Sequence, residues 1–213
     1  MFVFQKGKIL VVALLLNSFF LYSQKEEMTE TDSLVFSNKI IPASIEKEVK
    51  FALSHYPELQ DVNIEFRFKN DIKKSFMQAQ PNFLHLLFKC RQNRTYYVFI
   101  STHLKIENKD FDILEIPKDV LTGWIGHELG HIMDYVNRSG FGLIWFGIRY
   151  LTSGRYLKGA ERTADTYAVN HGMSEYIIAT KNFILNNANF SEKYKTRIQK
   201  WYLSPEEIME IVE

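Results

Sequence analysis

The sequence has one cysteine, almost no net charge and no apolar run of the roughly 20 residues that a membrane-spanning helix needs. Because Cys90 is alone, an exported chain carries no internal disulfide, and its core and any bound metal must stabilise it. We expect Cys90 to be a buried strand residue rather than a reactive thiol. The balance of 26 basic against 25 acidic residues argues against non-specific binding to nucleic acid.

The N-terminus has the pattern of a secretory signal peptide. Lys6 and Lys8 precede an apolar run over residues 9–16, which is too short to span a bilayer comfortably, and Ser23 is a suitable small residue before a cleavage site. We therefore predict a signal peptide over residues 1–24 and export to the periplasm or the extracellular space. An uncleaved segment would instead anchor the protein in a membrane.

The rest of the chain is expected to form one domain. Residues 25–40 are polar and predicted to be loosely ordered. Residues 41–213 show no internal repeat or low-complexity tract, and a hydrophobic content of 46% for the whole chain suits a single globular domain of ordinary core size.

Strand patterns come first in this domain and helical patterns follow. Residues 62–69 alternate strictly between apolar and polar, which is typical of a strand with one buried face. With strand-like runs at 83–89 and 95–101 they predict a small antiparallel sheet. Helices are predicted around 45–53 and over 118–138, 156–171, 174–186, 192–201 and 205–212, with Gly140 and Gly172 as helix stops. This order predicts an α+β fold.

Residues 127–131, His-Glu-Leu-Gly-His, form an HExxH motif inside the predicted helix 118–138. Residues four apart on a helix lie about 40° apart around its axis, so His127 and His131 can present both imidazoles to one metal ion. Glu128 is turned about 100° from His127 and lies beside the ion without binding it. The apolar residues around the motif indicate a core helix, which makes a solvated helix with two chance histidines the weaker interpretation.

A catalytic zinc ion takes three protein ligands and leaves a fourth position for water, so a third ligand is needed. Glu161 is the best candidate, and Asp165 lies one turn later on the same face of its helix. Small residues on both helices favour their close packing: Gly123, Gly126, Gly130, Ala160, Ala164 and Ala168. Packing would bring Glu161 to the metal and Asp165 to the back of a ligand histidine. Acidic residues one turn apart are also common on ordinary helices, which leaves another residue open as the third ligand.

On these two motifs the sequence resembles the gluzincin metallopeptidases, and within them the compact minigluzincins that include HtpX-like and CAAX prenyl endopeptidase-like proteins. The resemblance covers the region from the sheet to the last helices. It implies a zincin-like fold in which His127, His131 and Glu161 bind one zinc ion per chain. It also implies that Glu128 is the general base and that Asp165 orients a ligand histidine.

The expected activity is zinc-dependent hydrolysis of peptide bonds in a protein or peptide substrate, with Glu128 accepting a proton from the attacking water. Tyr167, His171 and Arg197 are candidates by position for the donor that stabilises the oxyanion, and strand 95–101 is a candidate edge for an extended substrate. Two other interpretations stay open: a catalytically silent, zinc-stabilised binding or inhibitory protein, and a zinc hydrolase of a non-peptide amide. His55, His85 and His103 are predicted to be surface or core residues, and the oligomeric state is not indicated.

The segment 141–151 lies between the two motifs and is unusually aromatic. Packed against the motif helix it would be part of the core, which is the favoured interpretation. If it is exposed, it would rest at a membrane interface as a peripheral contact or line an apolar substrate pocket. On such a surface Arg149 and Arg155 would suit anionic headgroups.

Overall fold

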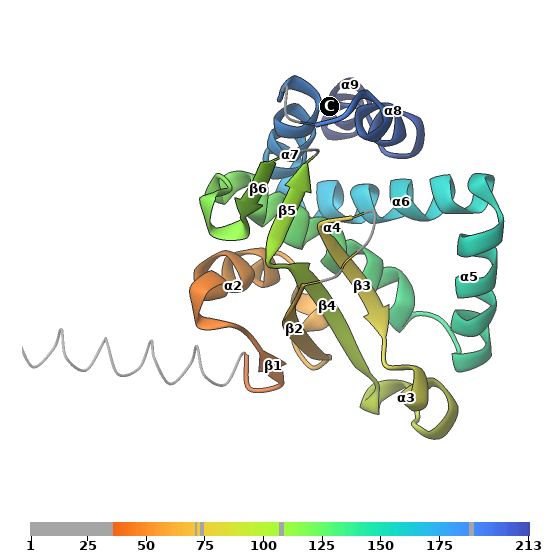
Figure 1. Ribbon diagram of the computed structural model, residues 1–213. Helices are drawn as coiled ribbons and strands as arrows, with labels where there is room; N and C mark the ends of the chain where they lie inside the picture. The colour runs from red at the N-terminus through yellow and green to blue at the C-terminus, as the bar shows by residue number, and fades with distance from the viewer. Residues whose placement is uncertain (1–35, 71, 73–74, 107–108, 188–189) are drawn as a thin grey trace, which may run out of the picture. The chain divides into compact units, whose positions relative to one another are not determined.

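A mixed β-sheet and the helices packed on it form an α+β unit from Asn38 to Glu213 in the computed structural model (Figure 1). The structure describes residues 36–213 except 71, 73–74, 107–108 and 188–189. The predicted signal peptide, 1–24, and most of the segment expected to be loosely ordered lie outside the described residues. Within the part that the structure describes, no helix is long and apolar enough to cross a membrane.

The main sheet has the strand order β1-β2-β4-β3. Its strands are β1 (Lys39–Ile40), β2 (Asn63–Lys69), β3 (Met77–Pro81) and β4 (Thr95–Ser101). β1 and β4 both run parallel to β2, whereas β3 runs antiparallel to β4 and forms one edge. The hairpin strands β5 (His103–Ile106) and β6 (Lys109–Asp112) pair antiparallel as a separate ribbon.

Parallel pairing within the main sheet corrects the prediction of a purely antiparallel one. Between β2 and β4 the chain passes through β3 and a helix, so it returns to the same end of the sheet before β4 begins. The parallel register sets Ile64 beside Tyr96 and Phe66 beside Val98, and all four side chains are buried. Lys39 and Ile40, at the end of the segment predicted to be loosely ordered, pair with β2.

The predicted strand 83–89 is a helix, α3 (Phe83–Phe88). The Asn82 side chain accepts hydrogen bonds from the backbone N–H groups of Leu84 and His85, and this cap starts the helix. Cys90 follows the helix and is exposed, so the expectation of a buried strand cysteine was wrong. The sequence analysis missed β1, β3, β5 and β6. The Met-Gln-Ala-Gln-Pro sequence of β3 carries little β propensity.

Most of the predicted helices are confirmed. The longer helices are α2 (Glu46–Ser54), α4 (Lys118–Val136), α5 (Gly140–Thr152), α6 (Gly154–Ala168), α7 (Ser174–Asn186), α8 (Glu192–Trp201) and α9 (Pro205–Val212). A π-helical turn, Val169–Met173, separates α6 from α7, and Gly172 within it has a φ of 76° that favours glycine. Gly140, predicted as a helix stop, instead begins α5.

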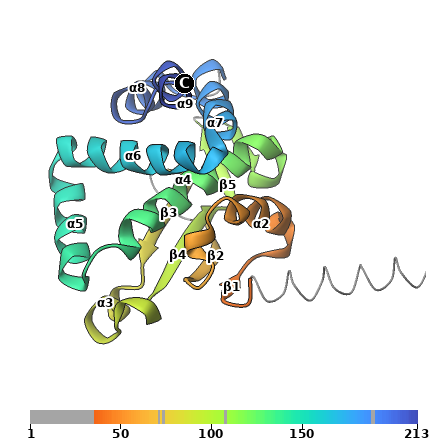
Figure 2. The same cartoon turned by 180° about the vertical axis from the view of Figure 1, so that it is seen from behind.

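The segment 141–151 forms α5 and divides between core and surface. Leu143 and Phe146 are buried, but Phe141, Trp145 and Leu151 are exposed. The interpretation of the whole segment as core is therefore wrong for its outer face. In Figures 1 and 2, α5 stands at a steep angle to α6 on the outer side of the unit.

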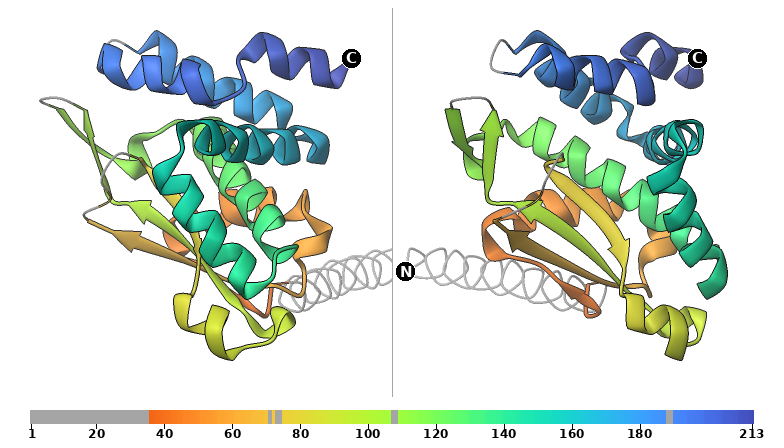
Figure 3. Two further views of the ribbon diagram at one scale, coloured as in Figure 1. Left: turned by 90° about the vertical axis from the view of Figure 1, so that its right-hand side faces the viewer. Right: turned by 45° about the vertical axis from the view of Figure 1, so that its right-hand side comes forward.

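Helix α4 lies at the centre of the unit, in contact with α2, β3, α6 and α7. Figure 3 shows it in green between the sheet and the C-terminal helices in blue. The predicted close contact with α6 is made at Gly130, where an added Cβ would lie 2.3 Å from the Ala164 carbonyl oxygen. Gly123 and Gly126 face Tyr176 of α7 and Met173 of the π turn, so the glycines of α4 allow close contact with these two segments as well as with α6.

We expect Gly130→Ala to lower the free energy of unfolding by about 1–3 kcal/mol, because the new methyl group meets backbone that cannot rotate away. Gly159→Ala is the matched control on α6. No atom lies within 4 Å of a Cβ at Gly159, so alanine there should stabilise the helix by up to ~1 kcal/mol. Urea unfolding of both variants measures the two effects, and equal stability of Gly130→Ala and wild type would contradict the close contact.

Candidate metal centre

Three buried side chains from two helices converge on one point. His127 and His131 come from α4 and Glu161 comes from α6, and one ligand atom of each lies within 4.8 Å of the others. Glu161 Oε2 is 3.2 Å from His127 Nε2 and 3.5 Å from His131 Nε2. Ligand atoms about 2.0–2.1 Å from a tetrahedral zinc ion lie about 3.3 Å from one another. The two distances from Glu161 are close to this value, and the three donors lie close enough together to hold a metal ion.

Glu161 is held from the opposite side by Tyr150 of α5. The Tyr150 hydroxyl donates a hydrogen bond to Glu161 Oε1, which leaves Oε2 to face the two imidazoles. Burial acts to raise the pKa of Glu161, but the hydrogen bonds and charges of His127 and His131 hold that pKa well below its usual range. The third candidate ligand is thus oriented as an ionised carboxylate.

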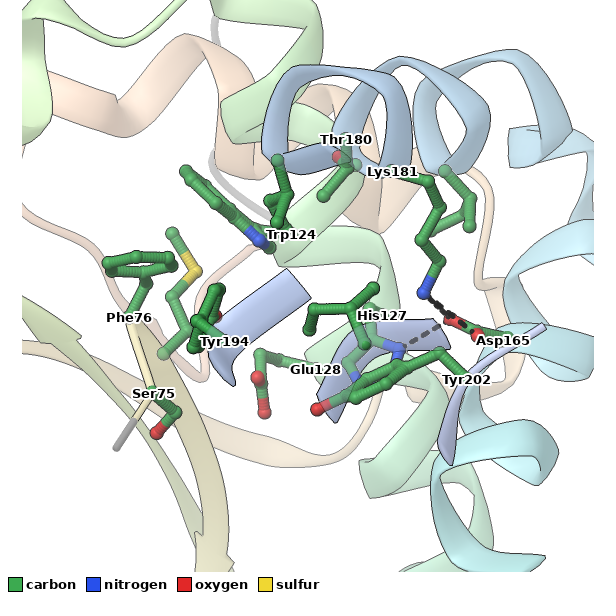
Figure 4. A pocket seen from close by; sticks show the side chains of 15 residues that line it. Ser75, Phe76, Trp124, His127, Glu128, Asp165, Thr180, Lys181, Tyr194 and Tyr202 are labelled. Carbon is green, nitrogen blue, oxygen red and sulfur yellow. Dashed lines mark hydrogen bonds and ion pairs between the residues drawn. The ribbon is translucent and has the colours of Figure 1, made fainter. Parts of the chain in front are cut away.

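Asp165 lies behind His127 and orients its ring. Asp165 Oδ1 is 2.8 Å from His127 Nδ1, and Lys181 Nζ lies 3.0 Å from Asp165 Oδ2 (Figure 4). The backbone N–H of Leu203 also donates to Oδ2, at 2.9 Å. A proton on Nδ1, shared with the carboxylate, leaves the Nε2 lone pair directed at the metal site.

Glu128 is buried beside these groups and bonded to the sheet. The backbone N–H of Ala79 on β3 donates to Glu128 Oε2 at 2.6 Å, and the Tyr135 hydroxyl is 3.4 Å from the Ala79 carbonyl oxygen. Burial raises the pKa of Glu128, against the lowering effect of His131 and His127. The motif carboxylate is therefore fixed between the ligand helix and an edge strand.

Three buried carboxyl groups surround His127. The carboxyl groups of Glu128, Glu161 and Asp165 lie in a buried region that, among the described residues, also holds the ammonium group of Lys181. Burial alone acts to lower the pKa of His127, yet Asp165 and Glu161 raise it to about 10. Buried carboxylates need a cationic partner, and a divalent cation at the three donors would take the place of the proton on His127 in that role.

A cavity of about 40 Å³ opens beside Glu128. Trp124, Glu128, Tyr194 and Tyr202 are part of its wall, and in Figure 4 the Tyr202 hydroxyl points toward the Glu128 carboxylate. Burial raises the pKa of Tyr202 well above its usual value, so the phenol stays protonated as a donor. The cavity has room for a few water molecules but not for a peptide side chain.

The remaining candidates of the sequence analysis lie elsewhere. His171 stacks on Tyr56, with its Nδ1 on the Tyr167 carbonyl oxygen, and neither His171 nor Tyr167 is among the described residues that line the cavity. These two candidates, named by position alone, therefore do not line this cavity. Arg197 lies over the Trp201 ring, and its charge acts on the pKa of Tyr202.

His55 and His85 are bonded to the backbone and are not among the three converging donors. His55 Nδ1 is bonded to the His171 carbonyl oxygen, and His85 Nδ1 accepts from the Thr95 N–H. The side chain of His103 lies outside the described residues. The structure instead adds Tyr150, Lys181 and Tyr202, which the sequence analysis missed because no local pattern connects them to the motifs.

Comparisons with protein-family models, with curated proteins and with solved structures found no match to this chain. The resemblance to gluzincins therefore rests on the residues of the two motifs, and the arrangement of the donors carries the functional argument.

We expect Asp165→Asn to weaken zinc binding about 10–100-fold, because the amide cannot stabilise the protonated Nδ1 of His127 as a carboxylate does. Competition titration with a chromophoric chelator measures the dissociation constant. Asp134→Asn is the matched control, since Asp134 lies on the ligand helix α4 but pairs with Arg138 and not with a ligand histidine. Equal affinities of Asp165→Asn and wild type, with both folded by circular dichroism, would rule out the orienting role.

Proposed function

We propose that this protein is a zinc-dependent metalloendopeptidase with a zincin-like active site, in which His127, His131 and Glu161 bind the ion and Glu128 is the general base. The observation that carries the proposal is the position of Glu128. Its carboxylate lies in the wall of the cavity next to the three converging donors, yet it is not one of the cluster. A purely structural zinc site has no use for such a carboxylate, which favours an enzyme over a silent binding protein.

Each residue of the site has a distinct task in this proposal. Zinc, when bound, supplies a Lewis acid that lowers the pKa of its water to ~7 and polarises the substrate carbonyl. Glu128 takes the proton from the attacking water and passes it to the leaving amine, so no second residue is needed to carry the proton. Asp165 keeps His127 oriented throughout, and Tyr150 does the same for Glu161.

Tyr202 is the best candidate for the donor to the oxyanion. Its ring centroid is 5.4 Å from that of His127, and its hydroxyl points into the cavity toward Glu128 (Figure 4). A neutral phenol beside a developing negative charge stabilises the transition state more than the ground state. Tyr194 also lines the cavity but stacks on Phe190, which places it second.

The sheet edge for an extended substrate is β3 rather than β4. The predicted strand 95–101 is β4, which pairs with β2 on one side and with β3 on the other, so both of its edges are already occupied. On the outer edge of β3, the N–H of Ala79 is bonded to Glu128. A polypeptide that pairs with this edge would replace that bond and leave Glu128 free to accept a proton.

The decisive variant is Glu128→Gln. We expect it to bind one zinc ion per chain like wild type, measured by elemental analysis, but to cleave casein at least ~10²-fold more slowly, because the amide cannot accept the proton. A chelator should abolish wild-type cleavage and added zinc should restore it. Cleavage at the wild-type rate by Glu128→Gln would overturn the proposal.

A proteome-derived peptide library tests the reaction class in the same pair of proteins. New peptide termini that appear with wild type and not with Glu128→Gln would establish endopeptidase activity and give its specificity. Wild-type protein that binds zinc but produces no such termini would favour the silent binding protein or the hydrolase of a non-peptide amide.

Tyr202→Phe tests the oxyanion donor. We expect kcat to fall about 10²-fold with little change in KM, because the hydroxyl acts on charge that develops only in the transition state. Tyr194→Phe removes a hydroxyl from the same cavity wall and should leave kcat close to wild type. A larger loss for Tyr194→Phe than for Tyr202→Phe would reverse the assignment. Thermal melts check that both variants fold.

A further inference from the structure

Helix α5 presents an apolar face to solvent. Phe141, Trp145 and Ile148 follow one another at intervals of four and three residues and are 83%, 60% and 47% exposed, and Leu151 near the end of the helix is 85% exposed. At 100° per residue, the first three lie within about 60° of one another around the axis. An ordinary surface helix turns its polar face outward, so α5 has the reverse pattern on this side.

Helix α3 extends the same kind of surface. Its exposed residues are Phe83, Leu84, Leu87 and Phe88. α3 packs against α5, and at their contact a Cβ on Gly140 would lie 2.3 Å from the Leu86 carbonyl oxygen. We call the exposed apolar residues of α3 and α5 together the α3–α5 patch. Exposed apolar residues that gather on two packed helices are the kind of surface that binds a partner or a membrane.

The charged residues within and just after α3 and α5 are all basic. The sequence has no Asp or Glu from residue 72 to 106 or from residue 135 to 160, although acidic and basic residues nearly balance over the whole chain. These two stretches contain α3 and α5. Lys89, Arg91, Arg149 and Arg155 are exposed within them, and none forms an ion pair with another residue that the structure describes.

We propose that the α3–α5 patch docks on the surface of an anionic phospholipid bilayer, with its Phe, Leu, Ile and Trp side chains among the acyl chains and its basic residues at the headgroups. Aromatic residues beside Lys and Arg are the composition of membrane-interface surfaces. The basic residues disfavour a second copy of this chain as the partner of the patch. A two-fold contact through the patch would place the basic residues of one copy against those of the other.

Docking through this surface would set the candidate metal centre close to the bilayer. Tyr150 lies on the inner side of α5 and bonds Glu161, so only one helix, about 10 Å wide, separates the ligand from the docked face. Bilayer binding itself does not depend on the proposed peptidase activity, and the two can fail separately.

Brominated phospholipids test the contact at the patch itself. Trp145 is 60% exposed on α5, whereas Trp124 is 8% exposed. We expect vesicles with brominated acyl chains to quench the fluorescence of the full-length exported protein, and Trp145→Phe to lose most of this quenching. Equal quenching in wild type and Trp145→Phe would overturn the proposal, because any lipid contact would then lie elsewhere.

Vesicle sedimentation separates the apolar and charge contributions. Phe141→Ser with Leu151→Ser should lower partitioning onto phosphatidylglycerol-containing vesicles at least about tenfold. Met209→Ser, at a 52% exposed residue of α9, is the matched control and should leave it unchanged. Arg149→Gln and Arg155→Gln should each lower binding about fivefold on these vesicles and not on pure phosphatidylcholine.

The oligomeric state in the absence of lipid gives the opposing outcome. We expect the wild-type protein to sediment as a monomer in analytical ultracentrifugation. A dimer that dissociates in Phe141→Ser with Leu151→Ser, together with no vesicle binding by wild type, would assign the patch to self-association and overturn the lipid proposal. Circular dichroism of each variant confirms that the helices are retained.

Discussion

The contact between α4 and α6 at Gly130 and Ala164 determines the geometry of the site. Helices usually pack with their axes 8–10 Å apart, and the separation depends on the side chains between them. Here a glycine meets the backbone of an alanine, so the helices approach closely enough for His127 and His131 to reach Glu161 directly. The same approach brings Asp165 behind His127. Most features of the candidate metal centre follow from this one backbone contact.

The sequence predicted the elements whose signals are local. Helices α7, α8 and α9 have the predicted bounds because capping residues and glycines mark their ends. The sheet was predicted less well, since pairing depends on how the chain returns and not on the strand patterns alone. The apolar run 83–89 fits a buried strand as well as a short helix, and the Asn82 cap decides for the helix.

The candidate ligands were predictable because each motif occupies one face of one helix. Periodicity alone places His127 beside His131 and Glu161 one turn from Asp165, and the small residues indicate that the two faces meet. The supporting residues have no such signal. Tyr150, Lys181 and Tyr202 reach the site from other elements, through packing that spacing in the sequence does not reveal. Tyr167 and His171 were candidates only by position in the chain, and the structure places His171 on Tyr56 with Tyr167 beside it.

The hydrogen bond from Leu203 to Asp165 has a consequence for how such a site changes over evolution. The donor is a main-chain N–H, which every residue type except proline supplies. Mutation can therefore replace the leucine side chain freely as far as this bond is concerned, while the C-terminal segment stays attached to the aspartate. Part of the support for the His127 imidazole therefore depends on the path of the main chain and not on which residue stands at position 203. Distant relatives can keep this support with a different residue there.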